Sequence, residues 1–108
     1  MFATSNEKLL LLLLDRCYRL APNKWVKAAV LFETLKQFPA LAELLDAHRG
    51  GADRELRELT QNAQVFERDG AYQISNAGSW TAKRYRVPKV IEPDMTQIVE
   101  RLIHVESA

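Results

Sequence analysis

The chain has little cysteine: Cys17 is the single one among 108 residues. A lone cysteine excludes an intramolecular disulfide, and a reducing cytoplasm is the simplest location to expect. Leu13, Leu14 and Leu20 are close to Cys17 in the sequence. We therefore expect its side chain to be a small buried hydrophobe instead of a reactive thiol.

Long hydrophobic runs are also lacking. The longest leucine run, Leu9 to Leu14, has six residues, follows Glu7 and Lys8, and is closed by Asp15 and Arg16. Six residues are too few for the apolar core of a signal peptide and far too few for a membrane span. We therefore expect no membrane partner.

Residues that bind metals or perform catalysis are sparse. The two histidines, His48 and His104, are far apart, and no cysteine pair or spaced carboxylate cluster accompanies either of them. Cys17 could form a dyad with a histidine, but the chain has no nucleophile elbow and no glycine-rich phosphate loop. The sequence predicts no metal, no cofactor and no enzymatic activity.

Charge is balanced overall but unevenly placed. The net charge is +1, with 47% hydrophobic and 27% charged residues, which is typical of one soluble globular domain. Residues 70–91 hold four basic residues and no acidic one. These four, Lys83, Arg84, Arg86 and Lys89, follow a predicted hairpin, where a nucleic-acid backbone would need positive charge.

Apolar spacing and capping residues predict five helices. Thr4 to Glu7 fits a capping box that starts a helix ending near Leu20, before Pro22. Further helices are expected over residues 23–37, 40–49, 54–61 and 95–105, with Asp53, Asp94, Asn62 and Gly50 as caps or stops.

The first and last of these helices carry more apolar residues than one packed face needs. One explanation is a homodimer whose interface contains Leu9, Leu12, Ile98, Leu102 and Ile103. The alternative is a first helix that is central and buried nearly all round. The sequence leaves both explanations open.

A tight hairpin is predicted at Asp69-Gly70, a pair that tolerates the positive φ angles of a type I′ turn. Counting outward from the turn pairs Val65 with Ile74 and Glu67 with Tyr72. Ser75 follows at a favourable N-cap position for another helix. Such a hairpin after a short helix has the form of a wing.

The short helix before the hairpin carries the side chains best suited to contact bases. With Leu56 and Leu59 inward, Arg54, Arg57 and Gln61 fall on one exposed stripe. An ordinary solvated face is the alternative, because Glu55 and Glu58 can pair with these arginines along the helix.

The segment Tyr72-Gln73-Ile74-Ser75-Asn76-Ala77-Gly78 resembles the Y-x-[LI]-[ST]-x-x-G pattern of several bacterial regulators of the winged helix-turn-helix superfamily of DNA-binding domains. The resemblance, which covers Ala40 to about Arg86, implies a mainly α fold with a small β-hairpin, and the length predicts one domain spanning 1–108. Its parts would be an N-terminal helix at 1–22, a winged-helix core at 23–87 and a C-terminal helix at 94–106. It also implies that residues 54–61 form the recognition helix and that Arg68 lies at the wing tip.

We therefore expect a dimeric protein that binds double-stranded DNA as a transcriptional regulator or accessory factor, with phosphate contacts from Lys83, Arg84, Arg86 and Lys89. A protein-interaction module that uses the first helix, Trp80 and Tyr85 is one alternative. RNA binding is another, because Trp80 and Tyr85 are interleaved with basic residues and could stack on unpaired bases.

Overall fold

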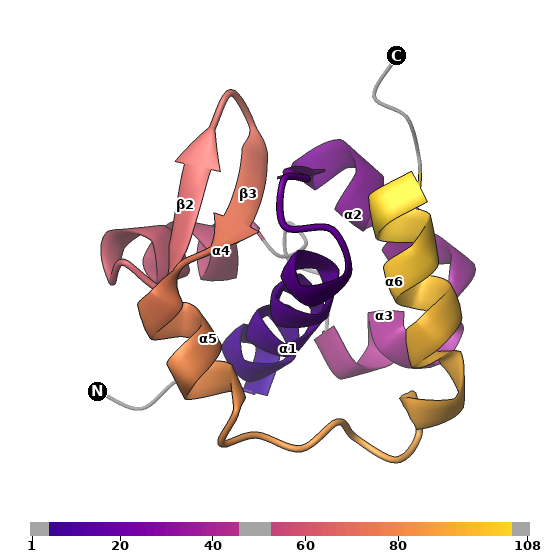
Figure 1. Ribbon diagram of the computed structural model, residues 1–108. Coiled ribbons are helices and arrows are strands. Elements are labelled where there is room, and N and C mark those ends of the chain that lie inside the picture. The colour runs from indigo at the N-terminus through magenta and orange to yellow at the C-terminus, as the bar shows by residue number, and fades with distance from the viewer. Residues whose placement is uncertain (1–4, 46–52, 105–108) are drawn as a thin grey trace.

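The computed structural model describes residues 5–45 and 53–104 of the chain. It is mainly helical and has one small antiparallel sheet (Figure 1). The elements, in order, are α1 (Ser5–Leu20), β1 (Val26–Lys27), α2 (Ala28–Gln37), α3 (Pro39–Leu45), α4 (Asp53–Gln61), β2 (Val65–Arg68), β3 (Ala71–Ile74), α5 (Asn76–Ala82), a 3-10 turn η1 (Glu92–Asp94) and α6 (Met95–His104). The expected caps at Thr4 and Gly50 lie outside the described residues.

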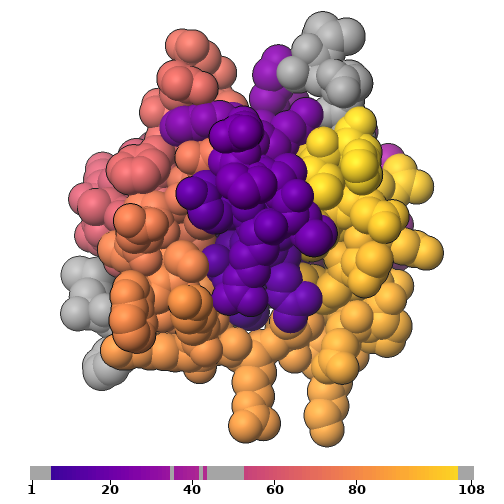
Figure 2. Space-filling model, viewed as in Figure 1, coloured from indigo at the N-terminus to yellow at the C-terminus, as the bar shows by residue number. Residues whose placement is uncertain are grey.

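Helix α1 lies at the centre of the molecule, with α5 on one side and α6 on the other (Figure 2). It also packs against α3, α4 and β3, so the leucine run meets partners on several sides. Leu10, Leu11 and Leu13 have no exposed surface. The central-helix explanation of the leucine run is therefore the one that the structure shows.

This burial corrects the expected dimer interface. The side chains of Leu9, Leu12, Ile98 and Leu102 are only 4%, 7%, 1% and 1% exposed within a single chain. Ile103 is partly buried and packs against the same core. These residues fill the interior of the protomer because α1 and α6 pack on each other, so they offer little free surface to a second copy.

The hairpin has the predicted register, with Val65 opposite Ile74 and Glu67 opposite Tyr72. Asp69 and Gly70 have φ angles of 53° and 80°, the left-handed conformation that a type I′ turn requires. Val65 and Ile74 face the core, whereas Arg68 and Gln73 lie on the other face of the sheet. The hairpin prediction is confirmed.

A third strand was missed by the sequence analysis. The second helix was expected to begin at Asn23, but Val26–Lys27 forms β1, and α2 begins at Ala28. Val26 pairs with Tyr72 and is 2% exposed, so burial of this side chain on the sheet outweighs continuation of the helix. The strand order is β1-β3-β2.

Ser75 joins three elements at the end of the hairpin. Its hydroxyl accepts a hydrogen bond from the Gly78 amide at 3.0 Å, as an N-cap does, and lies 2.6 Å and 2.9 Å from the carbonyl oxygens of Ala63 and Gln64. Close packing follows from the same contacts. A Cβ atom on Gly78 would overlap the Gln64 carbonyl oxygen, so this position accepts only glycine without rearrangement.

Helix α4 ends at Gln61, as predicted, but the residue that stops it differs from the prediction. Ala63, and not Asn62, takes the left-handed conformation, with a φ of 60°. The Ala63 and Gln64 amides donate to the carbonyls of Thr60 and Leu59, which is a Schellman motif without its usual glycine. The chain therefore turns sharply from α4 into β2.

The remaining helices differ from the sequence prediction at their ends. Helix α3 begins at Pro39 and its described part ends at Leu45, while the predicted remainder to Arg49 lies outside the described residues. Asp94 was expected to cap the last helix, but it belongs to the 3-10 turn η1, and the structure shows no hydrogen bond from α6 to its side chain. Among the described helices, none combines the length and the apolar character that a membrane span needs.

Candidate nucleic-acid interface

The stripe of α4 that was expected to contact bases is exposed. Leu56 and Leu59 are buried against the core, and Arg54, Arg57 and Gln61 face away from it. Arg54 Nε lies 3.7 Å from Glu58 Oε1, and the two side chains are 83% and 41% exposed. An exposed pair of this kind contributes little stability and can be exchanged for a phosphate or a base edge.

A shallow hollow of about 280 Å³ separates α4 from the hairpin. Arg57 and Gln61 line its helical side, and Glu67 and Tyr72 line its strand side. The pKa of Tyr72 is raised by burial and then by the carboxylates of Glu67 and Asp53, while Arg57 lowers it. The phenol lines this hollow as a hydrogen-bond donor.

The hairpin carries a cation stacked on an aromatic ring. The guanidinium carbon of Arg68 lies 4.3 Å from the centre of the Trp25 ring, close enough for a cation–π interaction. Phe66, 52% exposed, and Lys27 lie on the same outer face of the sheet. Sequence reasoning placed Trp25 inside a helix and so missed this partner of Arg68; the adjacent Val26, a strand-favouring residue, was the available signal.

Taken together, the charges of α4 and the hairpin do not favour binding to DNA. Residues 53–70 contain three basic and five acidic residues. One of the acidic side chains, Glu67, accepts a hydrogen bond from the Gly70 amide at 2.8 Å and so braces the turn. Phosphate attraction at this surface is therefore weaker than the arginines alone suggest.

The predicted phosphate-binding residues lie elsewhere. Lys83, Arg84, Arg86 and Lys89 are exposed, but they belong to the connection that leads from α5 to α6. The hairpin turn and this connection lie at opposite ends of the molecule (Figure 1). The expectation that positive charge gathers next to the wing is wrong, because α5 carries the chain away from the hairpin before the basic residues begin.

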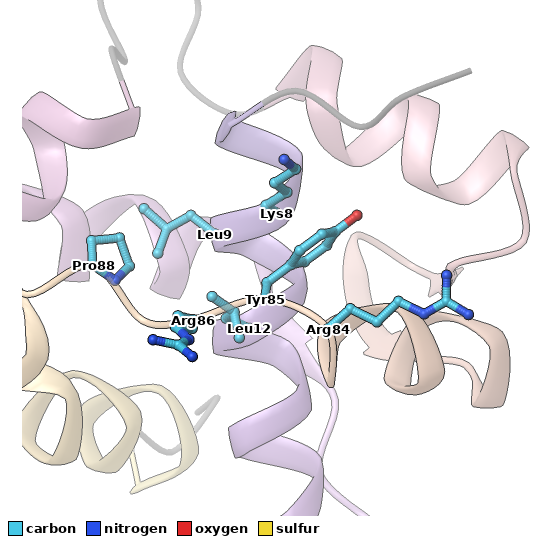
Figure 3. A pocket seen from close by; sticks show the side chains of 7 residues that line it. All are labelled: Lys8, Leu9, Leu12, Arg84, Tyr85, Arg86 and Pro88. Carbon is cyan, nitrogen blue, oxygen red and sulfur yellow. The ribbon is translucent and has the colours of Figure 1, made fainter.

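The connection and α1 enclose a depression that we call the basic groove. It consists of two adjoining hollows, of about 330 Å³ and about 800 Å³, which share Leu12, Tyr85, Arg86 and Pro88. In Figure 3, Tyr85 is turned toward α1, and Arg84 and Arg86 extend to opposite sides of the connection. The cations along the groove are Lys8, Arg16, Arg84, Arg86 and Lys89.

The two aromatic residues expected to stack on RNA bases do not form one platform. Trp80 is 68% exposed on α5, with Lys83 Nζ 5.7 Å from its ring centre. Tyr85 is half-buried against α1, and Lys8 Nζ lies 5.0 Å from its ring centre. Of these two rings, Trp80 is the one that is open to a base.

The part of the chain that the structure describes contains neither a cluster of metal ligands nor an exposed thiol. Within residues 5–45 and 53–104, no three His, Cys, Asp or Glu side chains gather as metal ligands would. Cys17 is buried, and burial raises the pKa of its thiol to about 12. The expectation of a buried hydrophobic cysteine is confirmed. His104 lies exposed at the end of α6, and His48 lies outside the described residues.

Known proteins offer no relative from which a site could be transferred. No protein-family model, curated protein or solved structure matches this chain. A functional assignment therefore rests on the geometry and charge of the described residues.

Proposed function

We propose that the chain is a winged-helix protein that binds double-stranded DNA, with α4 as the recognition helix and the β2–β3 hairpin as the wing. The element order supports this proposal. Helix α4 runs into β2 through a tight turn, and a three-stranded antiparallel sheet of order β1-β3-β2 lies beside it. The single observation that carries the proposal is the exposed stripe of α4, which lies next to a hairpin whose outer face carries Arg68.

The mechanism follows from the positions of these side chains. Helix α4 enters the major groove, where Arg57 and Gln61 can donate to base edges and Arg54 exchanges Glu58 for a phosphate. The hairpin then lies along the adjacent backbone, with Arg68 directed by the Trp25 ring. This arrangement gives each protomer one helix in the groove and one strand ribbon beside it.

The local excess of acidic residues sets the affinity that we expect. Residues 53–70 carry more negative than positive charge, so sequence-blind attachment to phosphates is weak. Binding then depends on base contacts from α4 and on a preferred sequence. A salt dependence equivalent to only a few phosphate contacts is expected for this surface.

The proposal is tested by fluorescence anisotropy of the full-length protein with labelled duplex DNA at several salt concentrations. A preferred duplex is first selected from a random library. Arg57→Ala should weaken binding to the selected duplex roughly tenfold or more while changing binding to random duplex less. Lys36→Ala is the matched control, because Lys36 is an exposed lysine on α2 paired only with Glu33 among the described residues. Failure to select any duplex at low salt contradicts the proposal.

A protein-interaction module is the second candidate, and two observations favour it. The α4 and hairpin surface has no net positive charge, and Phe66 presents a half-exposed aromatic ring on the outer face of the sheet. Aromatic anchors of this kind are enriched in protein interfaces. If no duplex is selected and Phe66→Ala abolishes capture of a defined protein partner while Lys36→Ala does not, this function replaces DNA binding.

A further inference from the structure

The basic groove has a floor and walls of different chemistry. Leu9 and Leu12 form the floor of the smaller hollow, and each is more than nine-tenths buried beneath it. Tyr85 and Pro88 contribute ring carbons to the walls. An apolar base bounded by rings is the usual form of a small-molecule site, and about 330 Å³ is within the size range of such sites.

Cations line the two hollows of the basic groove from two separate elements. Lys8 and Arg16 come from α1, and Arg84, Arg86 and Lys89 come from the connection to α6. Among the described residues, no carboxylate forms an ion pair with any of these five side chains. Glu92 is the only acidic residue that lines the groove within the described part of the chain. The field in the groove is therefore positive.

We propose that the basic groove binds a small amphipathic anion, a carboxylate attached to an apolar chain or ring. The apolar part rests on Leu9 and Leu12 between Tyr85 and Pro88, and the carboxylate lies at the rim, where Lys8 stands at one end of the hollow and Arg86 at the other. A hydrogen bond from the ammonium or guanidinium group holds the charge. The proposal does not depend on DNA binding by α4.

The geometry favours a small ligand over a nucleic-acid strand. Lys8 occupies one face of the Tyr85 ring, and the ring is half-buried against α1, so a base has little free surface there. Arg84 and Arg86 diverge to opposite sides of the connection instead of following one line of phosphates. A leucine floor beneath the cations also suits an apolar chain better than a sugar-phosphate backbone.

The groove adjoins the elements that position the α4 surface. Helix α1 forms one wall of the groove and packs directly against α4, α5 and β3. The other wall is the only covalent connection between α5 and α6. A ligand that bridges these two walls would tie the connection to α1, which makes the groove suited to an effector.

The test is a calorimetric titration of the full chain with octanoate, with acetate and octanol as probes that carry only the charge or only the apolar chain. We expect saturable octanoate binding and affinities for acetate and octanol that are at least about tenfold lower. Amide shifts in an NMR titration should centre on Leu9, Leu12 and Tyr85. Equal binding of octanol, or no saturation below about 10 mM octanoate, would overturn the proposal.

Variants locate the site. Lys8→Gln with Arg86→Gln should weaken octanoate binding roughly tenfold or more, because both variants remove a cation from the rim of the hollow. Lys36→Gln is the control and should bind as the wild type does, with thermal unfolding measured for both. Wild-type affinity in the double variant contradicts the site. A second result would also contradict the proposal. If a short single-stranded oligonucleotide displaces octanoate and binds more tightly through the same two residues, the groove is a nucleic-acid site.

Discussion

The Arg68 guanidinium stacks on the Trp25 ring, 4.3 Å from its centre, and so joins the end of β2 to the residue that precedes β1 across the intervening strand β3. Two exposed or half-exposed side chains thus hold the β2–β3 hairpin to the start of the sheet. Such a contact contributes modestly to stability but fixes the direction of the arginine.

A double-mutant cycle of Arg68→Ala and Trp25→Leu should therefore give a coupling energy of about 0.5–1 kcal/mol in the free energy of unfolding. Urea denaturation of the four proteins measures it. Arg68→Ala combined with Lys36→Ala is the control pair. Their effects on the free energy of unfolding should be additive, because Arg68 and Lys36 do not contact each other in the structure. Additivity in the Trp25 cycle would show that the stacked pair does not persist in solution.

Gly78→Ala should destabilise the fold by about 2–4 kcal/mol, because the new Cβ overlaps the Gln64 carbonyl oxygen and crowds Ile74. The sign is informative, since alanine in place of a helical glycine otherwise stabilises by about 1 kcal/mol. Asn76→Ala, on an exposed residue of the same helix, should shift stability by no more than about 0.5 kcal/mol. A Gly78→Ala protein as stable as the wild type would mean that α5 lies farther from β2 than described.

Ala63→Gly should stabilise the protein by about 0.5–1 kcal/mol in thermal or urea unfolding. Ala63 has a φ of 60° at the C-terminal end of α4, and glycine adopts this conformation without the Cβ clash that alanine suffers. Ala77→Gly, in the regular helix α5, provides the opposite control and should destabilise by about 0.5–1 kcal/mol. Loss of stability in Ala63→Gly would contradict the left-handed turn.

Cys17 predicts a pH dependence of stability. Burial raises the pKa of the folded thiol from an ordinary 9.0 to about 12, so above pH 9.0 the unfolded chain releases a proton that the folded chain keeps. Stability is therefore lost as the pH rises, by about 1 kcal/mol between about pH 8 and about pH 10. Subtracting the pH profile of Cys17→Ala isolates this contribution. Rapid modification of the native thiol by a disulfide reagent at neutral pH would argue against burial.

Substitutions at leucines of α1 can distinguish a role in dimer assembly from a role in core packing. Leu12→Asp should unfold the protomer instead of releasing soluble monomer, because Leu12 is 7% exposed and its helix is packed on several sides. Leu20→Asp changes a side chain that is 65% exposed and should leave the fold intact. Circular dichroism and sedimentation of both variants decide this. A folded, monomeric Leu12→Asp beside a dimeric wild type would restore the interface predicted from the sequence.

The hairpin and the N-cap that follows it could be predicted because their signals are local. Asp69-Gly70 specifies the turn, alternation on either side sets the register, and Ser75 caps the next helix within a few residues. The limits of α1 were predictable for the same reason, since its apolar spacing continues until Pro22.

Strand β1 and the basic groove depend on contacts that are distant in the sequence. Two residues are too few to show alternation, and Val26 becomes a strand residue only because Tyr72 pairs with it. Likewise, Arg86 follows the hairpin in the chain but lies at the other end of the molecule because α5 intervenes. Lys8 joins the groove through tertiary packing that no local pattern reveals.

The central position of α1 has a consequence for synthesis of the protein. The leucines of this helix leave the ribosome before the helices and strands that will cover them, and α6, one of the last elements made, packs against α1. Until α6 emerges, an apolar surface stays uncovered and can recruit chaperones or associate with other nascent chains. Emergence of α6, more than the formation of any single helix, is then the step that covers α1 and removes this apolar surface from aggregation.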